Sequence, residues 1–238
     1  MGIDTTHRTT EAEIMDDFTL KGEELRDALD KIADINRLLG GNTLTLQGVK
    51  QLLAKADAKP TITIADVGCG NGDMLRMLAD YGCNNNINLR LIGIDANRYT
   101  VDYAKLLSAG YETITYQCID IFKEEFKALQ YDIVLCTLTL HHFDNEHILK
   151  ILRVFYNYAA IGVVINDLHR SKLSYRLFGV LCRLFSLNSM SREDGLISIL
   201  RGFKKEELQQ YAEELGIEKQ SSIQWKWAFR YQWIISKI

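Results

Sequence analysis

Residues 61–95 constrain the fold more than any other stretch of this chain, because they read as a strand, a glycine loop, a helix and a second strand. Residues 61–67 are rich in β-branched side chains, which is typical of a buried strand. Gly68, Gly70 and Gly72 follow, and their lack of side chains lets a ligand approach the backbone closely. Apolar residues then recur at helical spacing, and the unpaired N–H groups of a helix start face the loop. This unit predicts a ligand site at the carboxyl end of the first strand.

The second strand of the unit, residues 89–95, ends in the carboxylate of Asp95. This acid follows the last loop glycine at a spacing close to the roughly 20 residues after which a nucleotide-binding βαβ unit places its ribose-binding acid. A dinucleotide fingerprint requires glycine or alanine where this loop has Asp73, and the Gly-Lys-Ser/Thr ending of a P-loop is missing. The loop therefore departs from both of these phosphate-binding patterns.

Strands and helices alternate along the rest of the chain. Beyond residue 95, helical patterns cover residues 98–107, 123–129, 145–158 and 204–215, and strand patterns cover residues 112–118, 131–136, 160–165, 217–224 and 229–237, with a turn at residues 225–227. Such alternation predicts an α/β fold with a parallel sheet and helices on both faces.

Pro60, the only proline of the chain, predicts a boundary between residues 1–59 and residues 60–238. The first part is predicted to be a helical extension in which a glycine pair separates two helices. This extension either packs against the sheet edge or forms a lid over the ligands, and both interpretations stay open. In the second part, an apolar stretch predicts a helical insertion over about residues 171–200.

The composition argues against several classes of function. A net charge of −3 without a basic run is unlike the basic face of a nucleic-acid-binding protein. No apolar stretch reaches the length of a membrane span and none resembles a signal peptide, so we expect a cytoplasmic protein without a membrane span. The five cysteines show no metal-type spacing, and we interpret them as reduced thiols.

The loop and its surroundings resemble a known family. The stretch Asp66-Val67-Gly68-Cys69-Gly70-Asn71-Gly72 is similar to motif I of the class I S-adenosylmethionine (SAM) methyltransferases, and the resemblance extends over about residues 60–167. It implies a Rossmann-like fold with a mostly parallel seven-stranded sheet, an antiparallel last strand, helices on both faces and an N-terminal helical extension. It also implies SAM as the cofactor and S-adenosylhomocysteine (SAH) as the product. The alternative is a structural glycine turn in another α/β protein.

The same resemblance gives cofactor roles to residues at the strand ends. Asp66 contributes to the methionine end, Asp95 accepts from the ribose hydroxyls, and Asp120 accepts from the adenine amino group. The alternatives are a helix cap for Asp95 and an Asx turn for Asp120. The predicted cofactor-binding residues are Asp66, Gly68, Cys69, Gly70, Asn71, Asp95, Ala96, Asp120, Ile121 and Thr137.

Residues 137–143, which follow the fourth predicted strand, are expected to flank the transferring methyl group. Their Leu-His-His sequence resembles a pattern common in small-molecule methyltransferases. The protein has to orient the reactants, and it has to supply a base where the nucleophile is a hydroxyl or an acidic carbon. We predict His142 as the first candidate base and Asp167 as the second, with His141 and His169 as further candidates. The alternative is that the histidine pair is structural.

The sequence also narrows the range of possible methyl acceptors. A chain with one proline cannot carry the Pro-Pro motif of the enzymes that methylate amino groups of nucleic acids, and the acid that holds magnesium in catechol methyltransferases is missing after the fourth strand, so no metal is predicted. The apolar insertion favours a hydrophobic acceptor, and the alternative is ordinary core packing. Residues 165–171 and 194–203 resemble a subgroup distantly related to quinone-biosynthesis methyltransferases. We therefore predict O- or C-methylation of a phenolic, quinone-like or polyketide-like small molecule. The alternatives are a protein methyltransferase and a non-catalytic SAM-binding accessory protein, and the oligomeric state stays open.

Overall fold

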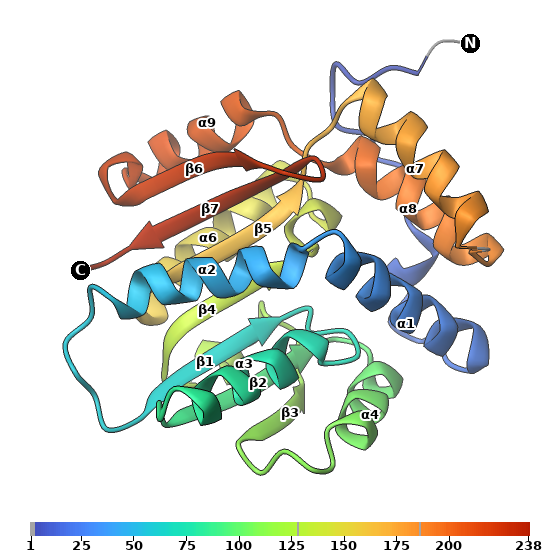
Figure 1. Cartoon of the computed structure of the whole chain (residues 1–238). Coiled ribbons are helices and arrows are strands. Elements are labelled where there is room, and N and C mark those ends of the chain that lie inside the picture. The colour runs from blue at the N-terminus through green and yellow to red at the C-terminus, as the bar shows by residue number, and fades with distance from the viewer. Residues whose placement is uncertain (1–2, 128, 186) are drawn as a thin grey trace.

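A seven-stranded sheet with the order β3-β2-β1-β4-β5-β7-β6 forms the centre of the molecule (Figure 1). The computed structural model describes residues 3–127, 129–185 and 187–238, so the first two residues of the predicted extension and residues 128 and 186 lie outside it. Strand β7 runs antiparallel to β5 and β6, whereas the other paired strands are parallel. The predicted fold class is confirmed. The strands are β1 (Ile62–Val67), β2 (Leu89–Asp95), β3 (Ile114–Cys118), β4 (Tyr131–Thr137), β5 (Ala159–Leu168), β6 (Ser221–Lys226) and β7 (Arg230–Ser236).

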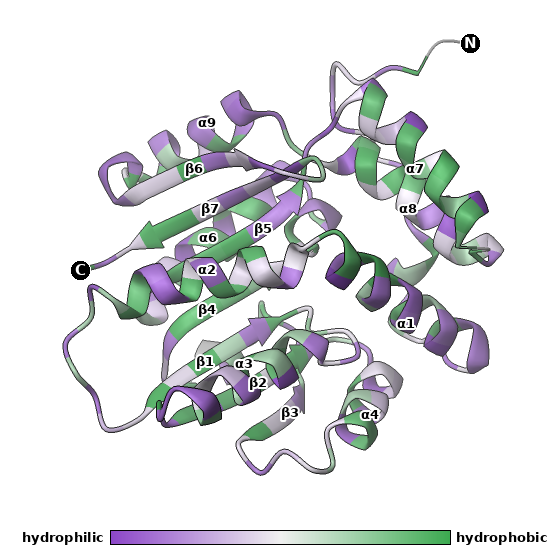
Figure 2. Cartoon of the chain, in the orientation of Figure 1, coloured by the Kyte–Doolittle hydropathy of each residue, from purple (hydrophilic) through white to green (hydrophobic). Residues whose placement is uncertain are grey.

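Helices cover both faces of this sheet because its central strands are apolar on both sides. In β1, Ile64 belongs to the hydrophobic cluster on one face, while its neighbour Ala65 belongs to the cluster on the other. Figure 2 shows β4 and much of β5 as hydrophobic, whereas the edge strand β6 and the outer side of α9 are mostly hydrophilic. The helices are α1 (Glu23–Leu38), α2 (Gly41–Leu53), α3 (Asp73–Asn84), α4 (Arg98–Leu107), α5 (Glu124–Lys127), α6 (Asn145–Tyr158), α7 (Lys172–Leu184), α8 (Ser189–Arg201) and α9 (Lys205–Leu215), with 3₁₀ turns η1 (Ile14–Asp16), η2 (Leu140–His142) and η3 (Glu218–Gln220).

The chain order reverses between β1 and β4, because β2 and β3 lie on one side of β1 while β4 and β5 lie on the other. In an open α/β sheet, ligands bind beyond the carboxyl ends of the strands at this reversal. The glycine loop follows β1 and the Leu-His-His segment follows β4, so both predicted motifs lie at the reversal. The topology therefore directs the search for a site to this edge.

Helices α1, α7 and α8 stand beyond this same edge (Figure 1). Helix α8 packs against α7, α1 and η1, so the N-terminal segment and the segment after β5 lie together. The predicted insertion is thus a pair of helices, and its boundaries, like the division at residue 60, stay a prediction. Among the described residues, no helix is both long enough and apolar enough to cross a membrane.

The C-terminal hairpin differs from its prediction. Residues 218–220, which were expected in a strand, form η3, and β6 continues through Trp225 to Lys226. The turn occupies residues 227–229, where Ala228 and Phe229 adopt positive φ angles of 61° and 55°. The sequence did not show this turn because it lacks the glycine or asparagine that usually marks a left-handed backbone.

Candidate active site

The glycine loop turns sharply at residues with left-handed backbone angles. Gly68 has φ 69°, and a Cβ there would lie 2.2 Å from Thr139 Oγ1. Gly70 has φ 51°, and its N–H donates to Asp95 Oδ2 over 3.3 Å. The loop thus joins the end of β1 to the carboxylate at the end of β2, and it needs glycine both for its conformation and for its close contacts.

A cavity of about 100 Å³ lies between this loop and α1, and we call it the loop cavity. A second cavity of about 450 Å³, the strand-end cavity, lies beside the ends of β2 and β3. Gly68 and Leu138 line both cavities, so the two are neighbours. The predicted cofactor residues divide between them: Asp66, Gly68, Cys69, Gly70, Asn71 and Thr137 line the loop cavity, and Asp95, Ala96, Asp120 and Ile121 line the strand-end cavity together with Gly68.

Carboxyl groups dominate the charge of the loop region. Burial raises the pKa of Asp66 well above its usual range, and Asp73 and Asp95 add to this shift. Burial also raises the pKa of Asp73, although Asn42 Nδ2 donates to its Oδ2 over 2.6 Å. Burial likewise raises the pKa of Asp95. Asp66 and Asp73 line the loop cavity, whereas no Lys or Arg among the described residues does so.

Two of the predicted cofactor residues have structural contacts as well. Asp120 is exposed, and its Oδ1 accepts from the N–H of Phe122 over 2.9 Å, which is the Asx turn named as its alternative. Asn71 Nδ2 donates to Asp30 of α1 over 2.9 Å. Asp95 does not cap α4, because Asn97 occupies the cap and accepts from the first N–H groups of that helix.

A third cavity, of about 290 Å³, lies between the sheet edge and helices α1, α7 and α8, and we call it the apolar cavity. Leu138 and His142 line both this cavity and the strand-end cavity, so the two are neighbours. Leu138 has a φ of 52°, an uncommon angle for leucine that lies directly after β4. The apolar side chains of the lining include Ile32, Ile35, Leu39, Leu177, Phe178, Leu181 and Phe229.

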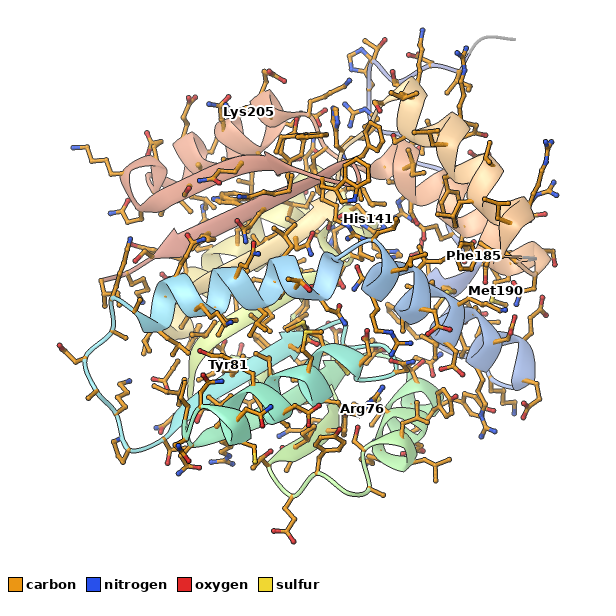
Figure 3. The ribbon with its side chains drawn as sticks, viewed as in Figure 1. Arg76, Tyr81, His141, Phe185, Met190 and Lys205 are labelled. Carbon is orange, nitrogen blue, oxygen red and sulfur yellow. The ribbon has the colours of Figure 1, made fainter. Side chains whose placement is uncertain are left out.

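Two stacked histidines stand at the edge of this cavity. The rings of His141 and His142 lie 4.3 Å apart between centroids. His141 Nδ1 lies 2.7 Å from Asp167 Oδ1, and His142 Nδ1 lies 2.7 Å from Asp16 Oδ1. Figure 3 shows His141 between the sheet and the α7–α8 pair. Each imidazole is therefore oriented through Nδ1 by its own carboxylate.

Glu13, from the N-terminal extension, completes what we call the histidine–carboxylate cluster: Glu13, Asp16, His141, His142 and Asp167. Glu13 Oε1 lies 3.6 Å from His141 Nε2, an atom that makes no hydrogen bond with the described residues. Burial raises the pKa of Glu13 to about 7. Arg201 Nη1 lies 3.5 Å from Glu13 Oε1 and 2.6 Å from Asp16 Oδ2, so the cluster includes a permanent cation.

Glu13, His141 and His142 also offer ligand atoms that lie within 4.8 Å of one another, a spacing at which they could hold a metal ion. Carboxylates at Nδ1 of both imidazoles are typical of metal-binding histidines. Arg201 opposes such an ion, because its guanidinium already contacts two acids of the cluster. The absence of a metal stays a prediction.

The remaining candidate bases differ in their access to the cavity. Asp167 is buried and lines none of the three cavities described. Burial acts to raise its pKa, but the contacts with His141 outweigh it and hold the pKa below the usual range. His169 lines the apolar cavity, its Nδ1 accepts from Trp225 Nε1 over 3.1 Å, and burial lowers its pKa.

Three site residues were missed in the sequence or interpreted differently. Glu13 and Arg230 line the apolar cavity, and neither lies near a recognisable motif. Arg170, which follows the fifth predicted strand and could in the sequence either bind an acceptor carboxylate or phenolate or pair with a surface acid, is fully buried and pairs with Glu207 over 2.6 Å. No sequence signal marks Glu13 or Arg230, because the structure brings both to the cavity through segments that fold back over the strand ends.

Comparisons with known proteins agree with this geometry. Residues 64–162 match the family model described as a methyltransferase domain. A plantazolicin methyltransferase, BpumL, in complex with SAH has 16% identity and a TM-score of 0.63 over 88% of this chain and 89% of that chain. The magnesium protoporphyrin IX methyltransferase ChlM from Synechocystis PCC 6803 has 17% identity and a TM-score of 0.52 over 84% of each chain.

A third solved structure, an O-methyltransferase family protein from Burkholderia thailandensis, has 15% identity and a TM-score of 0.59 over 87% of this chain and 59% of that chain. A comparison with curated protein sequences gives no match. At identities this low, the similarity to the solved structures shows a common fold and nothing beyond it. Residues 64–162 therefore match a methyltransferase-domain model, and the chain has the fold of the class I SAM-dependent methyltransferases.

Proposed function

We propose that this chain transfers a methyl group from SAM to a small molecule with a hydrophobic body. The observation that carries the proposal is the meeting of the three cavities at Leu138, which lines all of them. Two of these cavities are lined by the predicted cofactor residues, and the third is lined mainly by apolar side chains. One continuous region thus offers a cofactor site and an acceptor site that share a wall.

The charge of the loop cavity supports SAM as the cofactor. SAM is cationic at its sulfonium and at its amino group, and it carries no phosphate. Asp66 is buried and Asp73 and Asp95 are partly buried, and burial raises the pKa of all three carboxyl groups. A cationic ligand offsets this cost, whereas a phosphate would increase it.

The chain's residues would hold the cofactor at three places. Asp66 and the loop backbone are placed for the methionine end, and Asp95 for the ribose hydroxyls. Asp120 and Ile121 line the cavity beyond, where they suit an adenine ring. When bound, SAM supplies the activated methyl group. The protein's part is to orient the acceptor and to remove a proton from it.

We favour His142 as the base. It lines the apolar cavity and the strand-end cavity, so it borders both ligands. Because its Nδ1 contacts Asp16 over 2.7 Å, Nε2 is the ring nitrogen left to accept a proton. Asp16 then stabilises the imidazolium that forms. Asp167 is less suited, because its oxygens already accept from His141 and from the N–H of Leu168.

The N-terminal extension serves as part of the lid in this proposal. Met15, Asp16 and Phe18 line the strand-end cavity, and Glu13 lines the apolar cavity. Asp194 of α8 fixes this segment, because its two oxygens accept from the N–H groups of Ile14 and Met15 over 2.7 and 2.9 Å. The extension thus supplies walls to both sites as well as packing against the sheet.

A two-stage experiment tests the function. Purified protein is first titrated with SAM, SAH and NAD while its melting temperature is followed, because a ligand that binds the native state raises it by mass action. We expect shifts with SAM and SAH alone. Methyl transfer from SAM is then assayed by mass spectrometry on phenols, quinols and aromatic polyketide acids. A shift with NAD and none with SAM would refute the proposal.

A further inference from the structure

Arg230, the first residue of β7, forms part of the wall of the apolar cavity. Its side chain is buried, with 3% of the residue exposed. Its Nε and Nη1 atoms make no hydrogen bond, and no described residue forms an ion pair or a side-chain hydrogen bond with this guanidinium. A buried cation beside a cavity, without a partner from the protein, needs an explanation.

The other buried arginines of this region are paired. Arg170 contacts Glu207 over 2.6 Å, and Arg201 contacts Asp16 over 2.6 Å. Asp167 is the carboxylate whose charge raises the pKa of Arg230, but its hydrogen bond is with His141 and not with this arginine. Burial lowers the pKa of Arg230 to about 10, so the guanidinium is charged at neutral pH. The positive charge of Arg230 is therefore not paired with a carboxylate of the described residues at this wall of the cavity.

Gly41, which has no side chain, leaves space for the guanidinium of Arg230. A Cβ on Gly41 would lie 3.2 Å from Arg230 Cζ and 1.9 Å from Asn36 Oδ1, so only glycine permits both side chains here. Asn36 Nδ2 donates to Asn42 Oδ1, and Asn42 in turn donates to Asp73 beside the glycine loop. This chain of amides fixes the wall of the acceptor site against the cofactor loop.

The other charged groups of the cavity do not offer Arg230 a partner. Asp194 accepts from the backbone of η1, and Glu13 accepts from Ser198 and lies beside Arg201. Lys31, on α1, is half-buried and lines the same cavity, so it is a second cation. The rest of the lining is mainly apolar. A ligand that suits all these features has a hydrophobic body and one anionic group.

We infer that Arg230 binds a carboxylate of the methyl acceptor, so that the substrate class is hydrophobic carboxylic acids. This inference rests on the proposed methyl transfer and adds the recognition element to it. A planar guanidinium matches a carboxylate with two parallel hydrogen bonds. A carboxylate held in this way is a poor nucleophile, because its charge is already compensated. It serves as the anchor, and the methyl group goes to another atom, nearer His142.

The test uses SAH-loaded full-length protein and three probes that share one hydrocarbon chain: decanoate, decan-1-ol and decylamine. Binding is measured by calorimetry. We expect decanoate to bind at least about tenfold more tightly than decan-1-ol, the effect of one hydrogen bond to a charged group, and decylamine to bind no better than decan-1-ol. Arg230→Met should abolish the preference for decanoate. Lys31→Met, which removes the other cation of the same cavity, is the matched control and should keep most of it.

Two further readouts separate this role from a structural one. Arg230→Met should leave the melting temperature of the ligand-free protein unchanged or raise it, because an unpaired buried charge is replaced by an apolar chain of similar length. The SAH-induced shift should persist in both variants. Equal binding of decanoate and decan-1-ol to the unmodified protein overturns the inference, as does a decanoate preference that survives Arg230→Met and is lost in Lys31→Met. A failure of SAH to bind instead counts against the proposed function, and the same probes are then compared on the ligand-free protein.

Discussion

The cofactor side and the acceptor side of this site are built in opposite ways. Apart from Thr137, the predicted cofactor residues come from residues 66–121, and they lie at the ends of three neighbouring strands. The wall of the apolar cavity comes from residues 13–39, 138–142, 168–199 and 227–230. The first side is a continuous part of the βαβ unit, whereas the second is assembled by segments that fold back over the sheet edge.

The two sides also differ in polarity. The carboxyl groups of Asp66 and Asp73 line the loop cavity, while apolar side chains and an unpaired arginine line the apolar cavity. In the proposed function, a site for a cationic cofactor thus adjoins a site that selects its ligand by shape and by one negative charge. If the proposed function holds, the ends of the sheet strands bind the cofactor and the segments added around the sheet select the acceptor.

The largest expected effect belongs to the shared wall. His142→Ala should lower turnover on a true acceptor by roughly 10²–10⁴-fold, because a positioned base is lost. SAH affinity should change little, since the cofactor residues are untouched. The control is His147→Ala, which removes an exposed histidine that also contacts a carboxylate, over 2.8 Å. Near-native turnover in His142→Ala together with loss in Asp167→Asn would instead identify the carboxylate as the base.

A deletion tests whether the extension belongs to the acceptor side. Removal of the first 21 residues takes away Glu13 and Asp16 but leaves α1, which buries Leu25, Ala28 and Leu29. Turnover should fall by about 10²-fold, because the base loses its orienting acid and the reactants lose a wall. The melting temperature should change much less. A shortened protein that fails to fold, or one that keeps full turnover, would show that these residues serve packing alone.

The cofactor side is probed by Asp95→Asn. SAH affinity should fall by about 10–100-fold, since the charged acceptor of the ribose hydroxyls is lost while its shape is kept. Calorimetric titration with SAH measures the change. Asp102→Asn on α4, where the acid is 59% exposed and lies 3.8 Å from Lys105, is the matched control and should bind SAH normally. If both variants bind SAH alike, Asp95 has no role in cofactor binding.

A pH experiment measures how much Glu13, a residue of the apolar cavity, lowers the free energy of unfolding near neutral pH. The pKa of Glu13 is raised from 4.5 to about 7, so the folded state holds this proton more tightly than the unfolded state. The protonated Glu13 carboxyl group contributes its full share to the free energy of unfolding below pH 4.5. This contribution is lost as the pH rises from 4.5 through 7. Glu13→Gln should therefore gain stability over the unmodified protein, by about 2–3 kcal/mol between pH 4 and pH 8, in urea unfolding. Glu11→Gln, at an exposed neighbouring acid, should show no such gain.

The smallest effect is expected from metal removal. Dialysis against a chelator should leave turnover and melting temperature unchanged, because Arg201 already supplies a cation to the histidine–carboxylate cluster. If turnover disappears with the chelator and returns with Zn²⁺, Glu13, His141 and His142 are metal ligands.

Much of the sheet and its helices could be predicted, because their signals are local. Helices α4 and α6 begin and end where the sequence predicts, since Asn97 and Asp144 cap them with their side chains. Strand β5 is longer than predicted, because Asn166 and Asp167 read as polar loop residues. In the structure they pair with β7, and Asn166 Nδ2 donates to Thr45 Oγ1 over 3.0 Å. Polar residues inside a strand are hidden from a periodicity argument when their partners come from elsewhere.

The acceptor side could be predicted only in outline. An apolar helical insertion was visible in the sequence, but Glu13 and Arg230 lie more than 200 residues apart and line one cavity. Nothing local to either residue indicates this, because the placement depends on how η1 docks on α8 and on where the last hairpin turns. The predicted cofactor residues could be grouped in one site from the strand order alone. The residues of the apolar cavity could be grouped only once the whole tertiary structure was known.

The antiparallel direction of β7 has a consequence for how such an enzyme can change. The parallel strands reach the site with their last residues, while β7 reaches it with its first, Arg230, directly after the turn at residues 227–229. Trp227, in that turn, also lines the apolar cavity and is 77% exposed. Insertions or substitutions in this surface turn can therefore reshape the pocket for a new acceptor without disturbing a single parallel strand. Substrate range can diversify at the hairpin while the methyl donor stays the same.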